Sequence, residues 1–258
     1  MIDLNLKGRK AIVTGASLGI GAAICKELSA MGAEVFCCAR DSIALDELCS
    51  SSEHITGISA DLGDKSETET FLAEVKKLAG GIDIVINNVG ASPSRNFLYT
   101  EDQDWEDLHQ LNLMSAVRCT REFLPYMREN KWGRVIMIAS SAAKYPSAAL
   151  IDYGATKAAL ISMSKSLARK YGRDGVLVNS VLPGLIHTAM WERAAKEIAS
   201  ANNTSVEDVI KNNGRTVPVG RYGTSEEVSA LVAFLCTDSA SYINGTSIEV
   251  DGGSAAHI

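Results

Sequence analysis

Three polar residues in the middle of the chain have the types and the spacing that acid–base catalysis needs. Tyr153 and Lys157 are four residues apart in the segment YGATK, and Ser140 lies thirteen residues before the tyrosine. In a helix, residues four apart lie on one face, so the phenol and the ammonium would be neighbours. Tyrosine has an ordinary pKa of about 10, and a fixed positive charge lowers it by favouring the phenolate. The pair is therefore expected to exchange a proton near neutral pH, as general acid–base catalysis requires.

Short apolar segments alternate with amphipathic ones, and this pattern predicts the elements that position the triple. The apolar segments show no clean alternation, which is typical of strands buried on both faces of a parallel sheet. Strand–helix–strand repeats imply right-handed crossovers. We expect one α/β domain over residues 1–258, a Rossmann-like, doubly wound parallel sheet of about seven strands with helices on both faces. The predicted strands cover 10–14, 34–39, 55–59, 82–87, 134–139, 176–182 and 246–250, and the predicted helices cover 19–31, 41–50, 64–79, 103–129, 152–171 and 225–236.

The segment 185–222, between the last two predicted strands, is long for a simple connection. It is partly helical in pattern and rich in asparagine, and residues 204–207 (TSVE) have the pattern of a capping box at a helix start. We expect this insertion to form a lid over the substrate. A plain helical hairpin on the surface is the alternative.

A glycine-rich turn, TGASLGIG, follows the first predicted strand directly. Glycines permit a tight turn and let a diphosphate approach the backbone, and a helix N-terminus offers unpaired N–H groups and a positive dipole end. The spacing differs from GxGxxG, but its position between a strand and a helix predicts a dinucleotide site. The residues expected to contact the cofactor in this turn are Gly15, Ser17, Leu18, Gly19, Ile20 and Gly21.

The end of the second predicted strand indicates which dinucleotide binds. An acidic residue there would bond the ribose 2′-hydroxyl of NAD, whereas an arginine accommodates the 2′-phosphate of NADP. Ala39 has no carboxylate, and the Arg40 guanidinium can bind a phosphate through two hydrogen bonds. Asp41 could repel that phosphate, but its position before SIALDEL suits a helix N-cap. NADP(H) is therefore the preferred cofactor, and NAD(H) is the alternative.

Together these segments resemble the motifs of the short-chain dehydrogenase/reductase family in its compact subtype, along essentially the whole chain. The resemblance implies that Tyr153 exchanges the proton, that Ser140 binds the carbonyl oxygen, and that Lys157 lowers the tyrosine pKa and binds the nicotinamide ribose. Asn112, in LHQLNLMS, would hold a water that links the lysine to solvent, with bridging of backbone groups as the alternative. Further cofactor contacts implied by the resemblance are Asp61, Leu62, Asn88, Gly90, Pro183, Gly184, Ile186 and Thr188, besides Tyr153 and Lys157 themselves.

The expected substrate is a ketone or aldehyde and its alcohol. Segments 91–97, 142–150 and 185–191 would line the pocket, and their composition favours an apolar or aromatic compound. The chain is similar to β-ketoacyl carrier-protein reductases, but Leu18 stands where many of those have a basic residue. Three alternatives stay open: an NAD-linked catabolic alcohol dehydrogenase, a 3-oxoacyl carrier-protein reductase, and a nucleotide-sensing module without catalysis. The four-residue gap between tyrosine and lysine disfavours an enoyl reductase. The expected pocket residues are Tyr145, Leu150, Met190 and Trp191.

Composition sets limits on partners and location. The formal net charge is −6 and basic residues are scattered, so neither nucleic acid nor an anionic membrane is an expected partner. No apolar run approaches the roughly 20 residues of a membrane span, and no secretory signal pattern is visible. The six cysteines have no zinc-like spacing, so we expect no metal, free thiols and a cytoplasmic location. The resemblance also implies a homodimer or homotetramer.

Overall fold

The computed structural model describes residues 3–255, apart from the side chain of Met190. Seven strands form one sheet in the order β3-β2-β1-β4-β5-β6-β7, and every neighbouring pair is parallel. This confirms the predicted single-domain, doubly wound α/β fold. The strands are β1 (Lys10–Thr14), β2 (Glu34–Ala39), β3 (Ile55–Ser59), β4 (Ile84–Asn87), β5 (Gly133–Ile138), β6 (Val176–Pro183) and β7 (Ser247–Val250).

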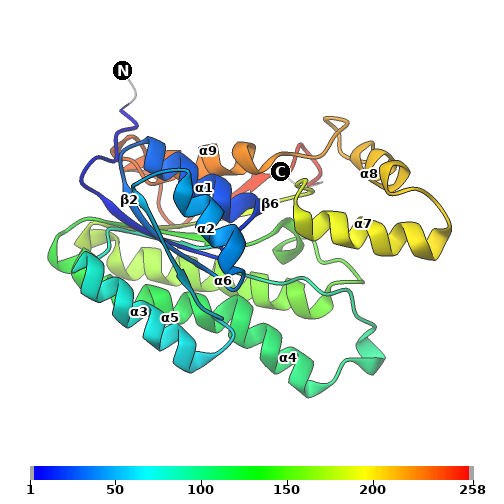
Figure 1. Ribbon diagram of the computed structural model, residues 1–258, viewed down its shortest axis with the longest axis horizontal. Coiled ribbons are helices and arrows are strands. Elements are labelled where there is room, and N and C mark those ends of the chain that lie inside the picture. Colours follow the sequence, from blue (N-terminus) through cyan, green and yellow to red (C-terminus); the bar gives the residue numbers. More distant parts are fainter. Residues whose placement is uncertain (1–2, 256–258) are drawn as a thin grey trace.

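Helices cover both faces of the sheet, as Figure 1 shows. On the upper face in that view, α1 and α9 lie side by side, and α2 packs beside them. On the lower face lie α3, α5 and α6. The bounds are α1 (Gly19–Ala30), α2 (Ser42–Ser50) and α9 (Ser225–Leu235) above, and α3 (Lys65–Ala79), α5 (Ser115–Glu129) and α6 (Ile151–Tyr171) below.

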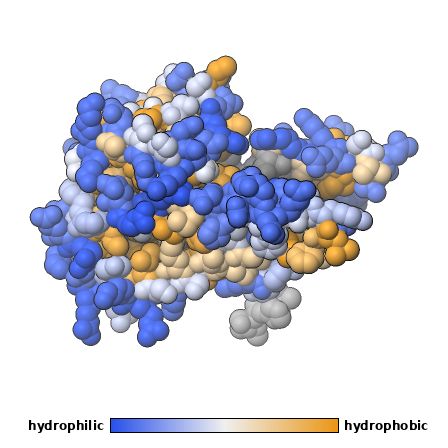
Figure 2. All heavy atoms as spheres, turned by 90° about the horizontal axis from the view of Figure 1, so that it is seen from below, coloured by the Kyte–Doolittle hydropathy of each residue, from blue (hydrophilic) through white to orange (hydrophobic). Residues whose placement is uncertain are grey.

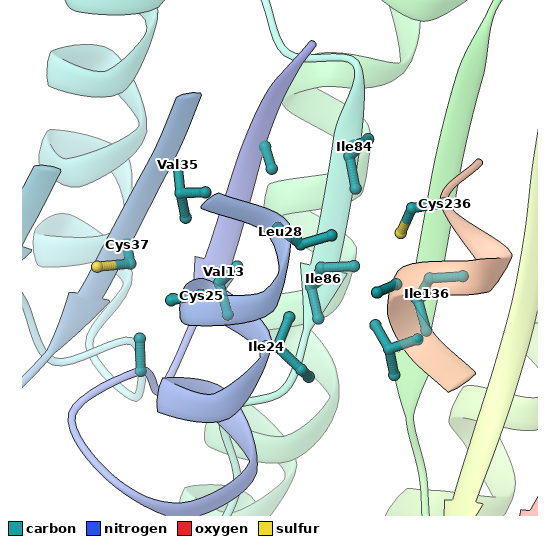
Figure 3. Close-up of a cluster of buried hydrophobic side chains, with 14 of the residues drawn as sticks. Val13, Ile24, Cys25, Leu28, Val35, Cys37, Ile84, Ile86, Ile136 and Cys236 are labelled. Carbon is teal, nitrogen blue, oxygen red and sulfur yellow. The ribbon is translucent and has the colours of Figure 1, made fainter. Parts of the chain in front are cut away.

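Two apolar cores lie between the sheet and these helix layers. Successive residues of a strand point to opposite faces, so Val13 of β1 joins the upper core and Ile12 joins the lower one. Figure 3 shows Ile24 and Leu28 of α1 lying over Ile86 and Val13 in the upper core. Each fully buried side chain of this size contributes about 1.5–3 kcal/mol to the free energy of unfolding. The strands read as continuous apolar runs because both of their faces are covered.

The strand order reverses between β1 and β4, and this reversal places the site. After β3 the chain crosses to the other side of β1, so the carboxyl ends of β1 and β4 lie next to each other. Ligands of open α/β sheets bind in the crevice at such a switch point. The glycine-rich turn after Thr14 and the segment after Asn87 are therefore neighbours in space.

The predicted helix over 103–129 is interrupted in the structure. It consists of α4 (Asp102–His109), a π-helical turn η2 (Gln110–Met114) and then α5. The other predicted helices and strands are confirmed, with boundaries that differ by at most two residues. The prediction failed at η2 because a π turn does not change the apolar pattern enough to be visible in the sequence.

The segment 185–222 folds into two helices that extend away from the sheet, at the right in Figure 1. These are α7 (Ala189–Asn202) and α8 (Val206–Gly214). The predicted capping box at 204–207 is wrong by one residue, because Ser205 is the N-cap and accepts a hydrogen bond from the Asp208 N–H at 3.0 Å. Short 3-10 turns complete the fold: η1 (Phe97–Tyr99), η3 (Ser141–Ala143), η4 (Gly172–Asp174) and η5 (Asp238–Ala240).

The surface is mostly hydrophilic, but the lower face carries a band of apolar side chains. Figure 2 shows this band from below, on the side of the molecule where α3, α4, α5 and α6 lie. Within residues 3–255, none of the helices combines the length and the apolar character that crossing a membrane requires.

Candidate active site

The glycine-rich turn is shaped for a bound anion. Gly15 and Gly19 have φ values of +68° and +58°, a region that side chains rarely adopt. A Cβ on Gly21 would lie 2.3 Å from the Gly15 carbonyl oxygen, so this position also requires glycine. Leu18 is the N-cap of α1 and is exposed, no side chain caps this helix, and its first turn has no acidic residue. The first N–H groups of α1 are thus available to a diphosphate, and the turn fits the cofactor predicted for it.

Asn88 fixes the glycine-rich turn from the neighbouring strand. Its side-chain Nδ2 donates to the carbonyl oxygens of Thr14 (2.8 Å) and Gly15 (2.9 Å). In return, the Thr14 hydroxyl accepts the N–H groups of Asn88 (2.9 Å) and Val89 (3.0 Å). Asn88 was predicted as a cofactor contact, which stays a prediction, and the structure shows that its side chain also holds the turn. Thr14 was not predicted, although the threonine of the TGASLGIG segment was the signal that could have revealed it.

Two other predicted residues of this region also serve the protein core. Ile20 is half-buried and packs against the upper core, whereas Leu62 is buried in the lower one and could reach a cofactor only through its backbone. Ser17 is half-buried in the turn.

At the end of β2, Arg40 lies on the surface beside Asp61. The two side chains are 72% and 39% exposed, and their nearest charged atoms are 3.6 Å apart. Asp41 accepts a hydrogen bond from the Ala44 N–H at 3.1 Å and caps α2, which confirms the prediction for it. Asp41 is thus engaged in this cap, whereas the Asp61 carboxylate lies beside the Arg40 guanidinium.

The segment after β6 meets the glycine-rich turn. The methyl group of Thr188 would lie 3.3 Å from a Cβ on Gly19, and Thr188 also caps α7. Pro183 ends β6, and a Cβ on Gly184 would lie 2.7 Å from the Cβ of Asp251. Ile186 is buried and pairs with Gly223 through an isolated bridge. The structure thus brings this segment and the turn together, as a shared cofactor site requires.

The predicted catalytic triple is assembled at the carboxyl end of β5. Tyr153 and Lys157 lie on α6, and the Lys157 Nζ is 5.8 Å from the centroid of the tyrosine ring. Lys157 is buried and donates a hydrogen bond to the Ile138 carbonyl oxygen at 2.9 Å. Ser140 follows β5, accepts the Ala142 N–H at 3.1 Å and hydrogen-bonds to Tyr153.

Burial controls the protonation of this triple. It raises the pKa of Tyr153 above its ordinary value, and the hydrogen bond with Ser140 only partly opposes that rise. Burial also lowers the pKa of Lys157 to about 8. The pKa of Tyr153 is therefore raised overall, and not lowered as expected, because burial outweighs the hydrogen bond with Ser140.

Asn112 lies in η2 and is buried beside the lysine. Its Oδ1 accepts the Ala91 N–H at 2.9 Å, and its Nδ2 donates to the Ala91 carbonyl oxygen (3.0 Å) and to the Thr156 hydroxyl (3.1 Å). A Cβ on Gly90 would lie 3.1 Å from both the Asn112 Oδ1 and the Lys157 Nζ. The structure shows the bridging of backbone groups that was the alternative for Asn112, and the predicted water-holding role stays a prediction. The role of Thr156 was not predicted, and the sequence offered no signal for it.

The four predicted pocket residues have different surroundings. The Tyr145 hydroxyl donates to the Glu249 Oε1 at 3.3 Å, and Leu150 is the N-cap of α6. Trp191 packs on Tyr222, with ring centroids 5.6 Å apart. Met190 falls within α7, but its side chain lies outside the described residues. The Glu249 carboxylate also pairs with the Lys144 Nζ at 2.8 Å, so the surroundings of Tyr145 are more polar than the sequence indicated.

The cysteine and acidic side chains form neither disulfides nor a metal site in the described residues. All six cysteines are free, and five of them are buried. In the part of the chain that the structure describes, no group of three or more histidine, cysteine, aspartate or glutamate side chains is arranged to hold a metal ion.

The fold and the site together define an oxidoreductase with a dinucleotide-type crevice and a Ser–Tyr–Lys cluster. A family model described as "Enoyl-(Acyl carrier protein) reductase" matches residues 15–255. The chain belongs to the short-chain dehydrogenase/reductase family, and it is an enzyme that acts on CH–OH or carbonyl groups.

Relatives match along nearly the whole chain. The chain is 38% identical over 259 residues to "Uncharacterized oxidoreductase YvrD" of Bacillus subtilis (strain 168), covering 98% of each protein. It is 34% identical over 249 residues to the 3-oxoacyl-[acyl-carrier-protein] reductase FabG of Haemophilus influenzae, covering 96% of this chain and 98% of the relative.

Solved structures show the same fold. The L-sorbose reductase of Gluconobacter frateurii, complexed with NADPH and L-sorbose, superposes with a TM-score of 0.95 at 31% identity over 100% of each chain. A variant of the actinorhodin polyketide ketoreductase with NADPH gives a TM-score of 0.91 at 29% identity, covering 96% of this chain and 98% of that one.

Proposed function

We propose that this chain is an NADP(H)-dependent oxidoreductase that interconverts a ketone or aldehyde and an alcohol, with Tyr153 as the general acid and base. One observation carries the proposal: Ser140, Tyr153 and Lys157 converge at the carboxyl end of the sheet, beside an anion-shaped glycine-rich turn. Carbonyl reduction needs a proton donor, a group that binds the carbonyl oxygen and a dinucleotide that carries the hydride, and these three groups next to the crevice can meet those needs.

Tyr153 is the proton donor in the direction of reduction. Because burial raises its pKa, the phenol stays protonated at neutral pH and can release a proton to the oxygen of a carbonyl group. Ser140, within hydrogen-bond reach of that phenol, would bind the same oxygen and stabilise the negative charge that develops on it. NADPH, when bound, supplies the hydride to the carbonyl carbon.

Lys157 supports the tyrosine from within the protein. Its ammonium lies next to the phenol ring and is held by the Ile138 carbonyl oxygen, so its position is fixed before any ligand binds. In the oxidation direction the phenolate must form first, and a protonated lysine at 5.8 Å from the ring favours that anion. Asn112 would keep the lysine end of this arrangement in place through Thr156 and Ala91.

The preference for NADP(H) over NAD(H) rests on Arg40. The residue is exposed just after β2, where the adenosine ribose is expected, and Ala39 before it offers no carboxylate to a ribose hydroxyl. Two structurally similar reductases are complexed with NADPH, which supports the same choice here.

Replacing Arg40 tests the cofactor preference. Arg40→Ala should weaken NADPH binding by about ten- to hundredfold, the value of a charge-assisted hydrogen bond to phosphate, and should leave NADH binding nearly unchanged. Fluorescence titration of both cofactors measures this, with Arg128→Ala, which breaks an exposed ion pair with Asp174, as the matched control. An equal loss for both cofactors would show that Arg40 does not bind the 2′-phosphate.

The substrate proposal is a small or medium carbonyl compound of apolar or aromatic character. The packed rings of Trp191 and Tyr222 support an aromatic character, whereas the Glu249 carboxylate next to Tyr145, which is paired with Lys144, supplies one polar group. Reduction of a 3-oxoacyl carrier protein is the second candidate, and the similarity to the FabG reductases favours it.

A substrate panel followed at the NADPH absorbance separates these candidates. It contains aryl and alkyl ketones, a 3-oxoacyl thioester and a ketose, each assayed also with NADH. Turnover of the ketones with NADPH is the expected result. Exclusive turnover of the thioester would favour the carrier-protein alternative, and no turnover with any carbonyl would overturn the proposed function.

Two further proposals concern larger parts of the molecule. We propose that the segment 185–222, with α7 and α8, acts as a lid, because it begins at the predicted nicotinamide contacts and extends away from the sheet. We also propose a homodimer or homotetramer, for which the apolar band on the lower face offers a surface. Hydrogen exchange of α7 with and without NADPH tests the lid, and light scattering tests the assembly.

A further inference from the structure

An arginine from the loop after β4 reaches the start of the catalytic helix. The Arg95 guanidinium lies 2.7 Å from the Asp152 Oδ2 and 3.1 Å from the Asp104 Oδ1. The side chain of Asp152 is 4% exposed and that of Arg95 is 28% exposed. This is a largely buried ion pair immediately before Tyr153, and neither of its members has a part in the chemistry derived above.

Asp152 also holds the backbone of the catalytic tyrosine. Its Oδ1 accepts the Tyr153 N–H at 2.8 Å, while its other oxygen binds Arg95. The N-cap of α6, Leu150, offers no side-chain hydrogen bond to the helix start. A carboxylate in the first turn therefore replaces the missing cap and interacts favourably with the positive end of the helix.

The other end of Arg95 is tied to α4. The Asp104 Oδ2 accepts the Glu101 N–H at 3.1 Å as part of the capping box that begins α4. Ala91, at the start of the same loop, is bound twice by Asn112. Arg95 thus joins the first turns of α4 and α6 through one guanidinium.

We propose that Arg95 is a positioning residue for the catalytic tyrosine, acting through the buried carboxylate of Asp152. This inference rests on the proposed role of Tyr153. Without Arg95, the carboxylate is a buried charge without its closest cation, which is strongly unfavourable. It would turn toward solvent and release the Tyr153 N–H, so the phenol would lose its fixed direction.

A direct role in substrate binding is the competing explanation for Arg95. The guanidinium already has one carboxylate at each terminal nitrogen, Asp152 and Asp104. An anionic substrate would have to displace one of them, so the local charge does not favour such a ligand. The loop that carries Arg95 is expected to line an apolar pocket, where a charged residue is unusual. The ion pairs with Asp152 and Asp104 explain why an arginine is present there.

Steady-state kinetics test this with the full-length protein. Arg95→Met should lower kcat by about ten- to hundredfold, as small misplacements of a reacting group do, with the KM for NADPH within about twofold. Arg95→Lys keeps a cation in reach and should retain most of the activity. Adding Asp152→Asn to Arg95→Met should recover much of the loss, because no buried charge is then left without a partner. Arg128→Met is the matched control, since it breaks an exposed ion pair with Asp174.

Hydrogen exchange of the Tyr153 amide, measured without substrate, gives a readout that does not depend on turnover. Arg95→Met should raise its exchange rate about tenfold or more, whereas Arg95→Lys and Arg128→Met should not, because only the first variant frees the amide. If Arg95→Met does not fold, Asp152→Asn, which keeps an oxygen acceptor for the amide, must show protected exchange for the proposal to stand.

Two results would overturn the inference: unchanged exchange together with wild-type kcat in Arg95→Met, or a rise confined to the KM of the carbonyl substrate, which would make Arg95 a substrate contact. Failure of the wild-type protein to turn over any carbonyl would overturn the proposed function alone, since the exchange rates still decide the role of Arg95.

Discussion

The catalytic triple and the segment 185–222 lie at the same end of the sheet but are built differently. Lys157 is buried and bonded to the Ile138 carbonyl oxygen at the end of β5, and Ser140 lies two residues after that strand end. By contrast, α7 and α8 bury a small cluster of their own, made of Ala195, Ala199 and Val209. The chemistry of the proposed reaction is thus fixed by the core of the fold, whereas the proposed lid depends on a few small apolar side chains.

This difference separates two kinds of mutational effect. A change in the triple or in its cofactor turn should alter the chemical step or cofactor binding, because these residues have no freedom to adjust. A change in α7 or α8 should alter substrate selection and local opening, because segments with few buried apolar contacts open at low free energy.

Removing the Tyr153 hydroxyl should have the largest effect. Tyr153→Phe should lower kcat by about 10²–10⁴-fold, the usual contribution of a general acid, while NADPH affinity stays nearly unchanged. The NADPH absorbance and a fluorescence titration measure the two quantities. Tyr171→Phe, at the other end of α6, is the control and should keep its activity. Wild-type turnover in Tyr153→Phe would refute the proposed mechanism.

The next effect in size should come from the cofactor turn. Gly21→Ala would place a Cβ 2.3 Å from the Gly15 carbonyl oxygen, and such overpacking costs about 1–3 kcal/mol of stability or displaces the turn. NADPH affinity should fall and the melting temperature should decrease. Gly172→Ala, whose Cβ would meet only the end of the Asn244 side chain, is the matched control. Unchanged NADPH binding in Gly21→Ala would separate this turn from the cofactor.

The lowered pKa of Lys157 should appear in the pH dependence of stability. Burial lowers this pKa from 10.5 to about 8, so between these values the unfolded chain binds the proton and the folded protein does not. The stability contribution of Lys157 therefore rises with pH across this window, and the cost of burying the charge is fully present below pH 8.

Denaturant unfolding of the wild type and of Lys157→Met, both without cofactor, measures this contribution. The difference in unfolding free energy should favour the variant most below pH 8 and should shrink by about 3 kcal/mol toward pH 10.5. Lys165→Met, on the same helix, should show no such trend. If the unfolding free energies of Lys157→Met and the wild type changed in parallel with pH, this would contradict a buried charge at this position.

The smallest effect should come from the proposed lid. Val209→Ala removes apolar volume worth about 1 kcal/mol from the α7–α8 cluster, whereas Val232→Ala removes the same volume from the upper core. Val232→Ala should lower the melting temperature of the whole protein. Val209→Ala should leave it nearly unchanged and alter the KM of the carbonyl substrate instead. Equal losses of melting temperature would show that α7 and α8 unfold together with the core.

The sequence predicted the fold well because its signals are local. The glycine-rich turn, the buried strands and the Asp41 cap depend on neighbouring residues, and each is confirmed by the structure. The tyrosine pKa could not be predicted in the same way, because the burial of Tyr153 is a property of the whole fold. The pair of Arg95 and Asp152 is 57 residues apart in the chain, so nothing local links them, although an aspartate directly before the tyrosine was a visible signal.

The π turn η2 has a consequence for the insertions and deletions that this chain tolerates. Each residue of an α-helix rotates the following ones by about 100° around its axis. A π turn absorbs one extra residue in a wider turn and so cancels that rotation. Deleting one residue from 110–114 would allow a regular helix with α4 and α5 still in phase, but it would remove the wide turn that contains Asn112. Asn112 would then turn away from Ala91 and Thr156 even though every apolar position of α5 stayed in place. The length of this helix is therefore set by the residue that it presents to Ala91 and Thr156, and we expect homologous chains of different length to differ in their loops and not here.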